Sequence, residues 1–94
     1  MDLSSAEKLA RKLLERHGIH KTWRFLFDDS PSAHGVCHYN VGLITLHPKV
    51  VGDDVMVMSV LLHEIAHALT PCHGHDAVWH AKVIDLIREH AWGC

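Results

Sequence analysis

The first part of the chain changes from helical spacing of apolar residues to strict alternation. From Ser4 to His17 the apolar positions recur every three or four residues, which predicts an amphipathic helix. Its inward stripe is expected to consist of Ala6, Leu9, Ala10, Leu13 and Leu14. The run Ser4-Ser5-Ala6-Glu7 has the form of a capping box, and Gly18 has that of the glycine after a helix end. We therefore expect one helix, bounded at both ends, before the first strand.

Three short segments after this helix have the pattern of strands. Residues 23–27 are expected to form the first, because aromatic side chains occupy alternate positions at Trp23, Phe25 and Phe27. The polar run 28–31, which ends in proline, terminates it. Gly35–Tyr39 and Leu43–His47 follow as two further strands, joined as a hairpin across residues 40–42. Pro48 is expected to end the last strand or to lie at its edge, because proline has no N–H to donate to a sheet.

The second half of the chain predicts two helices. Asp53 or Asp54 caps the first, which runs to about Leu69 and is apolar on nearly every side, as expected at the centre of a domain. A final helix is expected to begin near His75, and its inward stripe is predicted to contain Val78, Trp79, Val83, Leu86 and Ile87. The order helix, three strands, helix, helix predicts an α+β fold with an antiparallel or mixed sheet. We expect residues 1–94 to form this single domain.

Composition and cysteine usage indicate a globular protein of a reducing compartment. Hydrophobic residues make up 48% of the 94 residues, which is ordinary for a chain with a packed core. The N-terminus lacks the apolar segment of a signal peptide, and the longest strongly apolar stretch, Val55–Leu62, is too short to span a bilayer. Cys37, Cys72 and Cys94 contain no C-x-x-C pair and argue against a disulfide framework. We expect a soluble, unsecreted, cytoplasmic protein without membrane association.

Charge is unevenly distributed along the chain. The formal net charge is −2, which gives no global reason to bind nucleic acid. Residues 1–24 nevertheless hold six Lys or Arg against three acidic residues. The simpler interpretation is a solvated helix face. The alternative is a weak phosphate-contacting patch, through which the basic N-terminal helix would associate with nucleic acid.

Histidines gather where the chemistry is expected. The chain has eleven, and the stretch from His63 to His80 contains five of them. His63 and His67 lie four residues apart, so on a helix both imidazoles share one face and can reach one zinc ion. Glu64 completes the H-E-x-x-H pattern and is expected to act as general base on a water molecule. A chance match is disfavoured, because a buried helix would otherwise carry these polar groups without partners.

A third metal ligand has three candidates downstream. His73 would give the spacing H-x3-H-x5-H, which occurs in metzincins and in a family of small endoribonucleases. Metzincins also require a glycine three residues after the second histidine, where this chain has Thr70. His80 is expected to face solvent on the last helix, off its apolar stripe. His75 is expected at the start of that helix, on the same broad side as Trp79 and directed back at the metal. We favour His75 and keep His73 and His80 as alternatives.

Several other residues near the motif are candidates for accessory roles. Tyr39, His73 and His80 could each donate a hydrogen bond to a developing oxyanion, although each is also an ordinary surface or turn residue. Asp76 could hold a ligand imidazole, but an acid in the first turn of a helix more often stabilises that helix. For Cys72 and Trp79 we favour packing over metal binding or substrate contact.

The stretch His63-Glu64-Ile65-Ala66-His67-Ala68, followed by Gly74-His75-Asp76-Ala77-Val78-Trp79, resembles the SprT-like (Spartan) metalloproteases and the related WLM proteases. A W-x-F-x-F strand and the Gly35-Val36-Cys37 strand before the motif resemble that family too. The resemblance implies a zincin-like minimal core, with His63, His67 and His75 as zinc ligands and Glu64 as the catalytic residue. Asp76 departs from the family pattern, which has glycine there. The zinc ribbon and the DNA-binding extensions of larger members are not expected here.

The favoured hypothesis is a zinc endopeptidase of the SprT-like type that acts on protein or peptide substrates. The resemblance alone adds DNA-associated proteins as substrates. One alternative is a non-catalytic module in which His73 and His75 both bind zinc and close its coordination shell. A second is a metal-dependent endoribonuclease with His63, His67 and His73 as ligands. An ImmA-like protease is disfavoured, because no glutamate after His67 is well placed as its third ligand.

Overall fold

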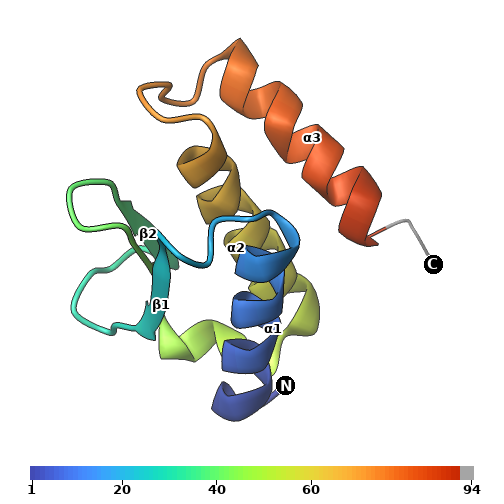
Figure 1. The fold of residues 1–94 in the computed structure, drawn as a ribbon. Coiled ribbons are helices and arrows are strands. Elements are labelled where there is room, and N and C mark those ends of the chain that lie inside the picture. The colour runs from blue at the N-terminus through green and yellow to red at the C-terminus, as the bar shows by residue number, and fades with distance from the viewer. Residues whose placement is uncertain (92–94) are drawn as a thin grey trace.

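The structure, a computed structural model, describes residues 1–91 and has three α-helices and one three-stranded sheet in that part of the chain (Figure 1). The elements are α1 (Leu3–Arg16), β1 (Arg24–Phe27), β2 (Gly35–His38), β3 (Leu43–Leu46), the 3-10 helix η1 (Pro48–Gly52), α2 (Asp54–Leu69) and α3 (Ala77–Ala91). Their order confirms the predicted α+β fold. Of the cysteines considered above, Cys94 lies outside the described residues.

The sheet is mixed, and β2 forms one of its edges. Strand β3 lies in the middle, parallel to β1 and antiparallel to β2. The predicted hairpin joins β2 and β3 through residues 39–42. Gly42 in this turn has a φ of +64°, and a Cβ there would collide with the carbonyl oxygen of Thr22. Glycine therefore permits both the turn and the close approach of the chain that enters β1.

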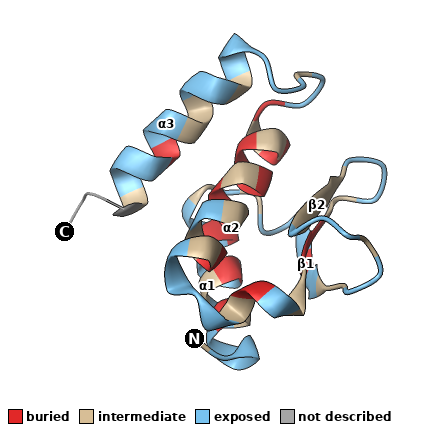
Figure 2. Cartoon of the chain, turned by 180° about the vertical axis from the view of Figure 1, so that it is seen from behind, coloured by how far each residue is buried: buried red, intermediate tan, exposed pale blue. Residues whose placement is uncertain are grey.

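Helix α2 is the centre of the domain, as its continuous apolar character predicts. It contacts the sheet, α1, η1 and α3, and Figure 1 shows it between β2 and α3. Buried positions follow it along its length (Figure 2). The core of the described chain consists of Ala6, Ala10, Leu13, Leu14, Phe25, Ile44, Leu46, Val50, Val57, Leu61, Leu62, Ile65, Ala66, Ala68 and Leu86.

The ends of α1 differ in how well the sequence predicted them. The predicted capping box at Ser4 is wrong, because the carboxylate of Asp2 caps the helix by accepting from the Ser5 N–H at 2.8 Å. The C-terminal prediction is confirmed: Gly18 has a φ of +71°, and the N–H of Ile19 reaches back to the Leu14 carbonyl at 3.0 Å. The helix therefore begins and ends one residue earlier than expected, and Gly18 follows its C-cap His17.

The buried stripe of side chains on helix α3 is narrower than predicted. It begins at Ala77 rather than near His75, since the Asp76 carboxylate accepts from the Trp79 N–H and caps the first turn. Leu86 is buried, but Val78 and Ile87 are 48% and 36% exposed, so their assignment to the inward stripe is wrong. The helix packs mainly on α2, and this single neighbour covers only a narrow stripe of the α3 surface.

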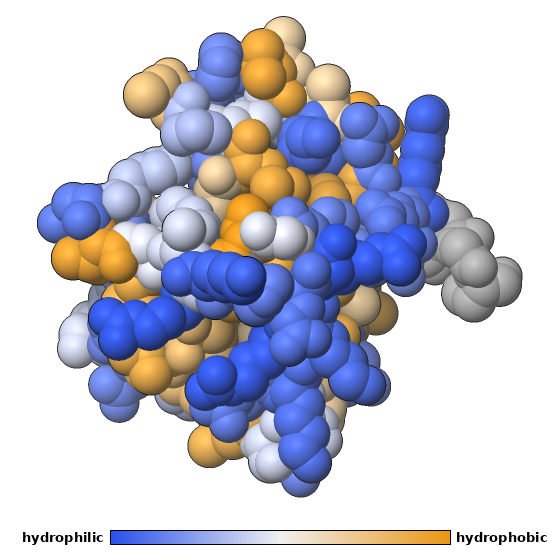
Figure 3. Space-filling model, viewed as in Figure 1, coloured by the Kyte–Doolittle hydropathy of each residue, from blue (hydrophilic) through white to orange (hydrophobic). Residues whose placement is uncertain are grey.

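The basic side chains of the N-terminal segment lie on an exposed helix face, as both interpretations of this segment require. Lys8, Arg11, Lys12 and Arg16 are all exposed on α1. Figure 3 shows hydrophilic side chains gathered over this helix. Weak association with nucleic acid through this face stays a prediction.

Among residues 1–91, no helix combines the length and the apolar character that crossing a membrane requires.

Candidate metal centre

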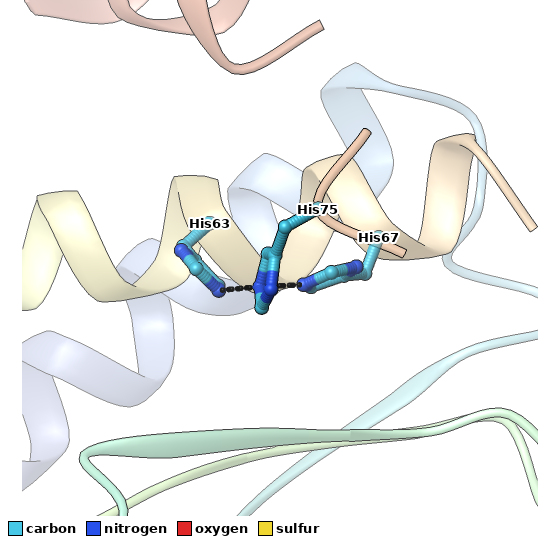
Figure 4. A group of neighbouring side chains, drawn as sticks. All are labelled: His63, His67 and His75. Carbon is cyan, nitrogen blue, oxygen red and sulfur yellow. Dashed lines mark hydrogen bonds between the residues drawn. The ribbon is translucent and has the colours of Figure 1, made fainter. Parts of the chain in front are cut away.

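Three imidazoles converge at the C-terminal half of α2. His63 and His67 project from successive turns of the helix, and His75 comes from the segment just before α3 (Figure 4). The Nε2 atom of His75 lies 3.3 Å from that of His63 and 3.1 Å from that of His67. The three side chains therefore present the same ring nitrogen to one point, from two separate segments of the chain.

The donor atoms fit a divalent metal of the zinc class. All three nitrogens lie within 4.8 Å of one another. Two nitrogens bound at about 2.0–2.1 Å in a tetrahedral arrangement would be about 3.3 Å apart, close to the two separations observed. Three imidazoles with no fourth protein ligand leave one coordination position for water or substrate. Among the described residues, no other His, Cys, Asp or Glu joins this group.

The structure places the three candidate third ligands in different environments. His75 lies in the cluster, whereas the His73 Nδ1 atom lies 2.7 Å from the carboxylate of Asp76. His80 is exposed on α3, as predicted. His75 precedes α3, so its predicted position on the first turn of that helix is wrong. Its position is set by the turn, in which Cys72 adopts a φ of +68°.

Asp76 fixes both sides of this turn. One carboxylate oxygen accepts from the Trp79 N–H at 3.0 Å, and the other lies 2.7 Å from His73. The hydrogen bond from the Trp79 backbone, followed by that of His73, lowers the pKa of the Asp76 carboxyl. These contacts match the helix-stabilising role expected for this acid. They hold the neighbouring His75 in the segment just before α3, where it faces α2.

Trp79 packs, as the sequence predicts, but the sequence did not reveal that it packs against all three imidazoles. Its ring stacks on His67 with centroids 5.1 Å apart, and meets His63 and His75 edge to face at 4.8 and 4.5 Å. Its indole N–H donates to the carbonyl of His63 at 3.4 Å. The signal was present in the sequence as a tryptophan one helical turn after His75. Trp79 therefore holds the rings in place from the α3 side.

Glu64 lies beside the cluster but is not part of it. Its side chain is buried, and one carboxylate oxygen lies 4.0 Å from the Nε2 atom of His63. Burial raises the pKa of this carboxyl to about 7. The residue also lines a pocket of about 310 Å³ together with His34, Gly35, Ser59, Val60 and His63. A carboxylate here can exchange a proton with a molecule in that pocket.

Gly35 allows β2 to approach α2 closely at this point. A Cβ on Gly35 would lie 2.6 Å from Val60 Cγ1, 3.0 Å from the Thr45 carbonyl oxygen and 3.3 Å from Glu64 Cγ. The sequence predicts Gly35 only as part of a strand and gives no signal of its contact with the Glu64 side chain. The edge strand and the helix thus enclose the carboxylate from two sides.

Tyr39 is the accessory candidate that adjoins the cluster. Its hydroxyl donates to the carbonyl of His67 at 3.0 Å, and its ring is 47% exposed. Together with Trp23 and the turn after α2, it lines a second pocket of about 610 Å³.

Burial, and then the nearby Glu64, raises the pKa of the neighbouring Cys37 thiol to about 12. Cys72 is exposed in the turn and lies outside the imidazole cluster.

The fold and the three-histidine cluster define an α+β domain with a candidate metal centre on an H-E-x-x-H helix. The sequence profile of the SprT-like family matches residues 3–89, nearly the whole chain. The chain belongs to the SprT-like family, whose metalloprotease-related theme agrees with this centre. A search of curated proteins and a search of solved structures each found no match.

Proposed function

We propose that this protein is a zinc-dependent endopeptidase. The observation that carries the proposal is the buried Glu64 carboxylate, 4.0 Å from one of three imidazoles that converge on a single point. Membership in the SprT-like family supports it. When bound there, a zinc ion would polarise a peptide carbonyl and make water a better nucleophile.

Glu64 would handle the protons of the reaction. Its burial raises the pKa of the carboxyl to about 7, which suits a group that accepts a proton and later returns it. The carboxylate would take a proton from water as the water attacks the scissile carbonyl carbon. It would then deliver that proton to the departing amine. Tyr39 is the candidate donor to the developing oxyanion; its hydroxyl now donates to the His67 carbonyl at 3.0 Å and would have to leave that acceptor to do so.

The substrate chain would bind along β2. This strand is an edge of the sheet, so its outer backbone groups can pair with an extended peptide without regard to sequence. The pocket beside Glu64 also contains Gly35, the first residue of β2. A peptide on this edge would therefore pass the carboxylate and the imidazoles. The second pocket, which Trp23 and Tyr39 help to line, would accept an apolar side chain of the substrate.

The other candidate functions have less support from the contacts. Both a closed four-ligand zinc module and a nuclease with His73 as a ligand need this imidazole at the metal. His73 instead pairs with Asp76 at 2.7 Å and lies outside the cluster. Action on proteins bound to DNA would need a nucleic-acid contact, for which the exposed basic face of α1 is the candidate.

Glu64→Gln tests the proposal. The amide keeps the size of the side chain but cannot accept a proton, so hydrolysis of an unfolded protein substrate should fall at least about 100-fold. Zinc content should stay the same, because Glu64 is not among the converging donors. His80→Gln, at an exposed position on α3, serves as the matched control and should keep full activity. Unchanged proteolysis by a zinc-loaded Glu64→Gln variant would refute the assignment.

A further inference from the structure

A second cluster of metal-ligating side chains joins the C-terminal ends of α1 and α3. His17 caps the end of α1, and Glu89 and His90 lie in the last turns of α3. One donor atom from each of the three residues lies within 4.8 Å of the others. The two helix ends are far apart in sequence but meet in space (Figure 1).

We propose that His17, Glu89 and His90 bind a second divalent metal ion of the zinc class, which fastens α3 to α1. The Nε2 atoms of the two histidines face each other at 2.7 Å, and both rings are at least partly shielded from water. Two imidazole nitrogens and one carboxylate form a ligand set that suits zinc rather than calcium or magnesium. Tetrahedral binding would need the two nitrogens about 3.3 Å apart, so the rings have only to separate slightly.

Arg16 orients the carboxylate of the cluster. Its guanidinium donates to Oε1 of Glu89 at 2.9 Å, whereas Oε2 of Glu89 lies 4.0 Å from the Nε2 atom of His90. The carboxylate therefore offers its two oxygens to different partners, as carboxylate ligands with a supporting hydrogen bond often do. Arg16 and Lys82 are cations close to His17, and their repulsion should make this site weaker than the three-histidine centre.

The second site is separate from the first but acts on the same helix. From Asp76 to His90 the chain advances fourteen positions, about 20 Å along a helix. Trp79, near the start of α3, packs on the imidazoles of the first centre. A metal at the far end of α3 would close a loop of 73 residues between His17 and His90 and hold the whole helix against the body of the domain. With three protein ligands, water would fill the fourth position, and we assign the site the role of holding the two helix ends together.

Zinc stoichiometry on the untagged chain tests this site. Metal-free protein is dialysed against buffered free zinc, and bound zinc is measured by mass spectrometry. Wild type should take up two equivalents, the second more weakly, whereas His17→Gln and His90→Gln should each bind one. His80→Gln should bind two, because its exposed imidazole belongs to neither cluster. Circular dichroism establishes that each variant is folded, and two variants on different helices guard against the failure of one.

The result distinguishes this site from the first centre. Loss of one equivalent in His90→Gln, with the other lost in His75→Gln, supports two independent sites. A wild type that binds one equivalent, lost in His75→Gln and kept in His90→Gln, overturns the second site and leaves the protease proposal intact. One equivalent that is lost in His90→Gln and kept in His75→Gln would support the second site and remove the basis of the protease proposal. Two equivalents that survive in both His17→Gln and His90→Gln also overturn the second site.

Discussion

Replacing Gly35 with alanine should destabilise the domain through one steric contact beside Glu64. A Cβ at this position would lie 2.6 Å from Val60 Cγ1 and 3.0 Å from the Thr45 carbonyl oxygen. The first contact is closer than side chains tolerate, and the second involves a backbone atom of the central strand. To relieve them, β2 has to move away from α2, which loosens the wall of the pocket around the carboxylate.

The size of the effect follows from the cost of overpacking. Inserting one methyl group into a filled interior typically costs about 1–3 kcal/mol. Alanine also lowers the entropy of the unfolded chain, which offsets about 0.4–1 kcal/mol of that cost. The net loss should therefore be about 1–2 kcal/mol, and in a domain of this size each kcal/mol lowers the Tm by about 4–8 °C. Gly52→Ala is the matched control, because a Cβ there meets nothing within 4 Å.

Urea denaturation followed by circular dichroism measures both variants against wild type. Gly52→Ala should be unchanged or slightly more stable. Combining Gly35→Ala with Val60→Ala removes the closest contact, so this double variant should lose less than the sum of the two single losses. Rescue should be incomplete, because the Thr45 carbonyl cannot retreat. If Gly35→Ala were as stable as Gly52→Ala, the close approach of β2 to α2 would be wrong.

Three further predictions concern the metal centre and the cysteines. His75→Ala should lose the zinc of this centre and His73→Ala should keep it, by mass spectrometry of purified protein; the reverse result would make His73 the ligand. Iodoacetamide at pH 8 should modify Cys72 well before Cys37, because a pKa of about 12 leaves only about one part in 10⁴ of the Cys37 thiol ionised. Comparable rates in peptide mapping would contradict the burial of Cys37. Chelation should speed amide hydrogen exchange in α3 more than in the buried part of α2. Equal protection of α3 with and without metal would exclude a coupling between metal binding and the docking of α3.

Most of the architecture was predictable, because its signals are local. The periodicity of apolar residues located α1, a long and nearly continuous apolar run located α2, and the alternation of aromatic residues located β1. Gly18 marked the end of the first helix through a backbone conformation that glycine adopts readily. The parallel pairing of β1 with β3 left no such signal. It depends on how α1 and α2 cover the sheet, which no window of sequence contains.

In the candidate site, too, the residues with local sequence signals were predictable and those positioned by contacts between distant segments were not. His63, Glu64 and His67 lie within one stretch of helix, where spacing alone places the three side chains. The positions of His73 and His75 depend on a turn in which Cys72 takes a positive φ and Asp76 caps the next helix, so spacing could rank them only roughly. The contacts of Gly35 and Trp79 join segments that are distant in sequence. Neither has a periodic pattern that could reveal it.

Helix α3 connects the stability of the domain to its metal centre. Leu86 is its one side chain in the buried core of the described chain, whereas Val78, Ile84 and Ile87 remain at least 36% exposed. Burial of apolar side chains therefore stabilises the docking of α3 less than it stabilises the position of the central helix α2. Trp79 and His75 add contacts with the imidazoles of His63 and His67 at the start of the helix. A metal bound by residues from both segments would stabilise only the arrangement in which α3 is docked. Metal binding and docking of α3 should therefore be one coupled equilibrium, and the same helix that completes the site should loosen when the metal is removed.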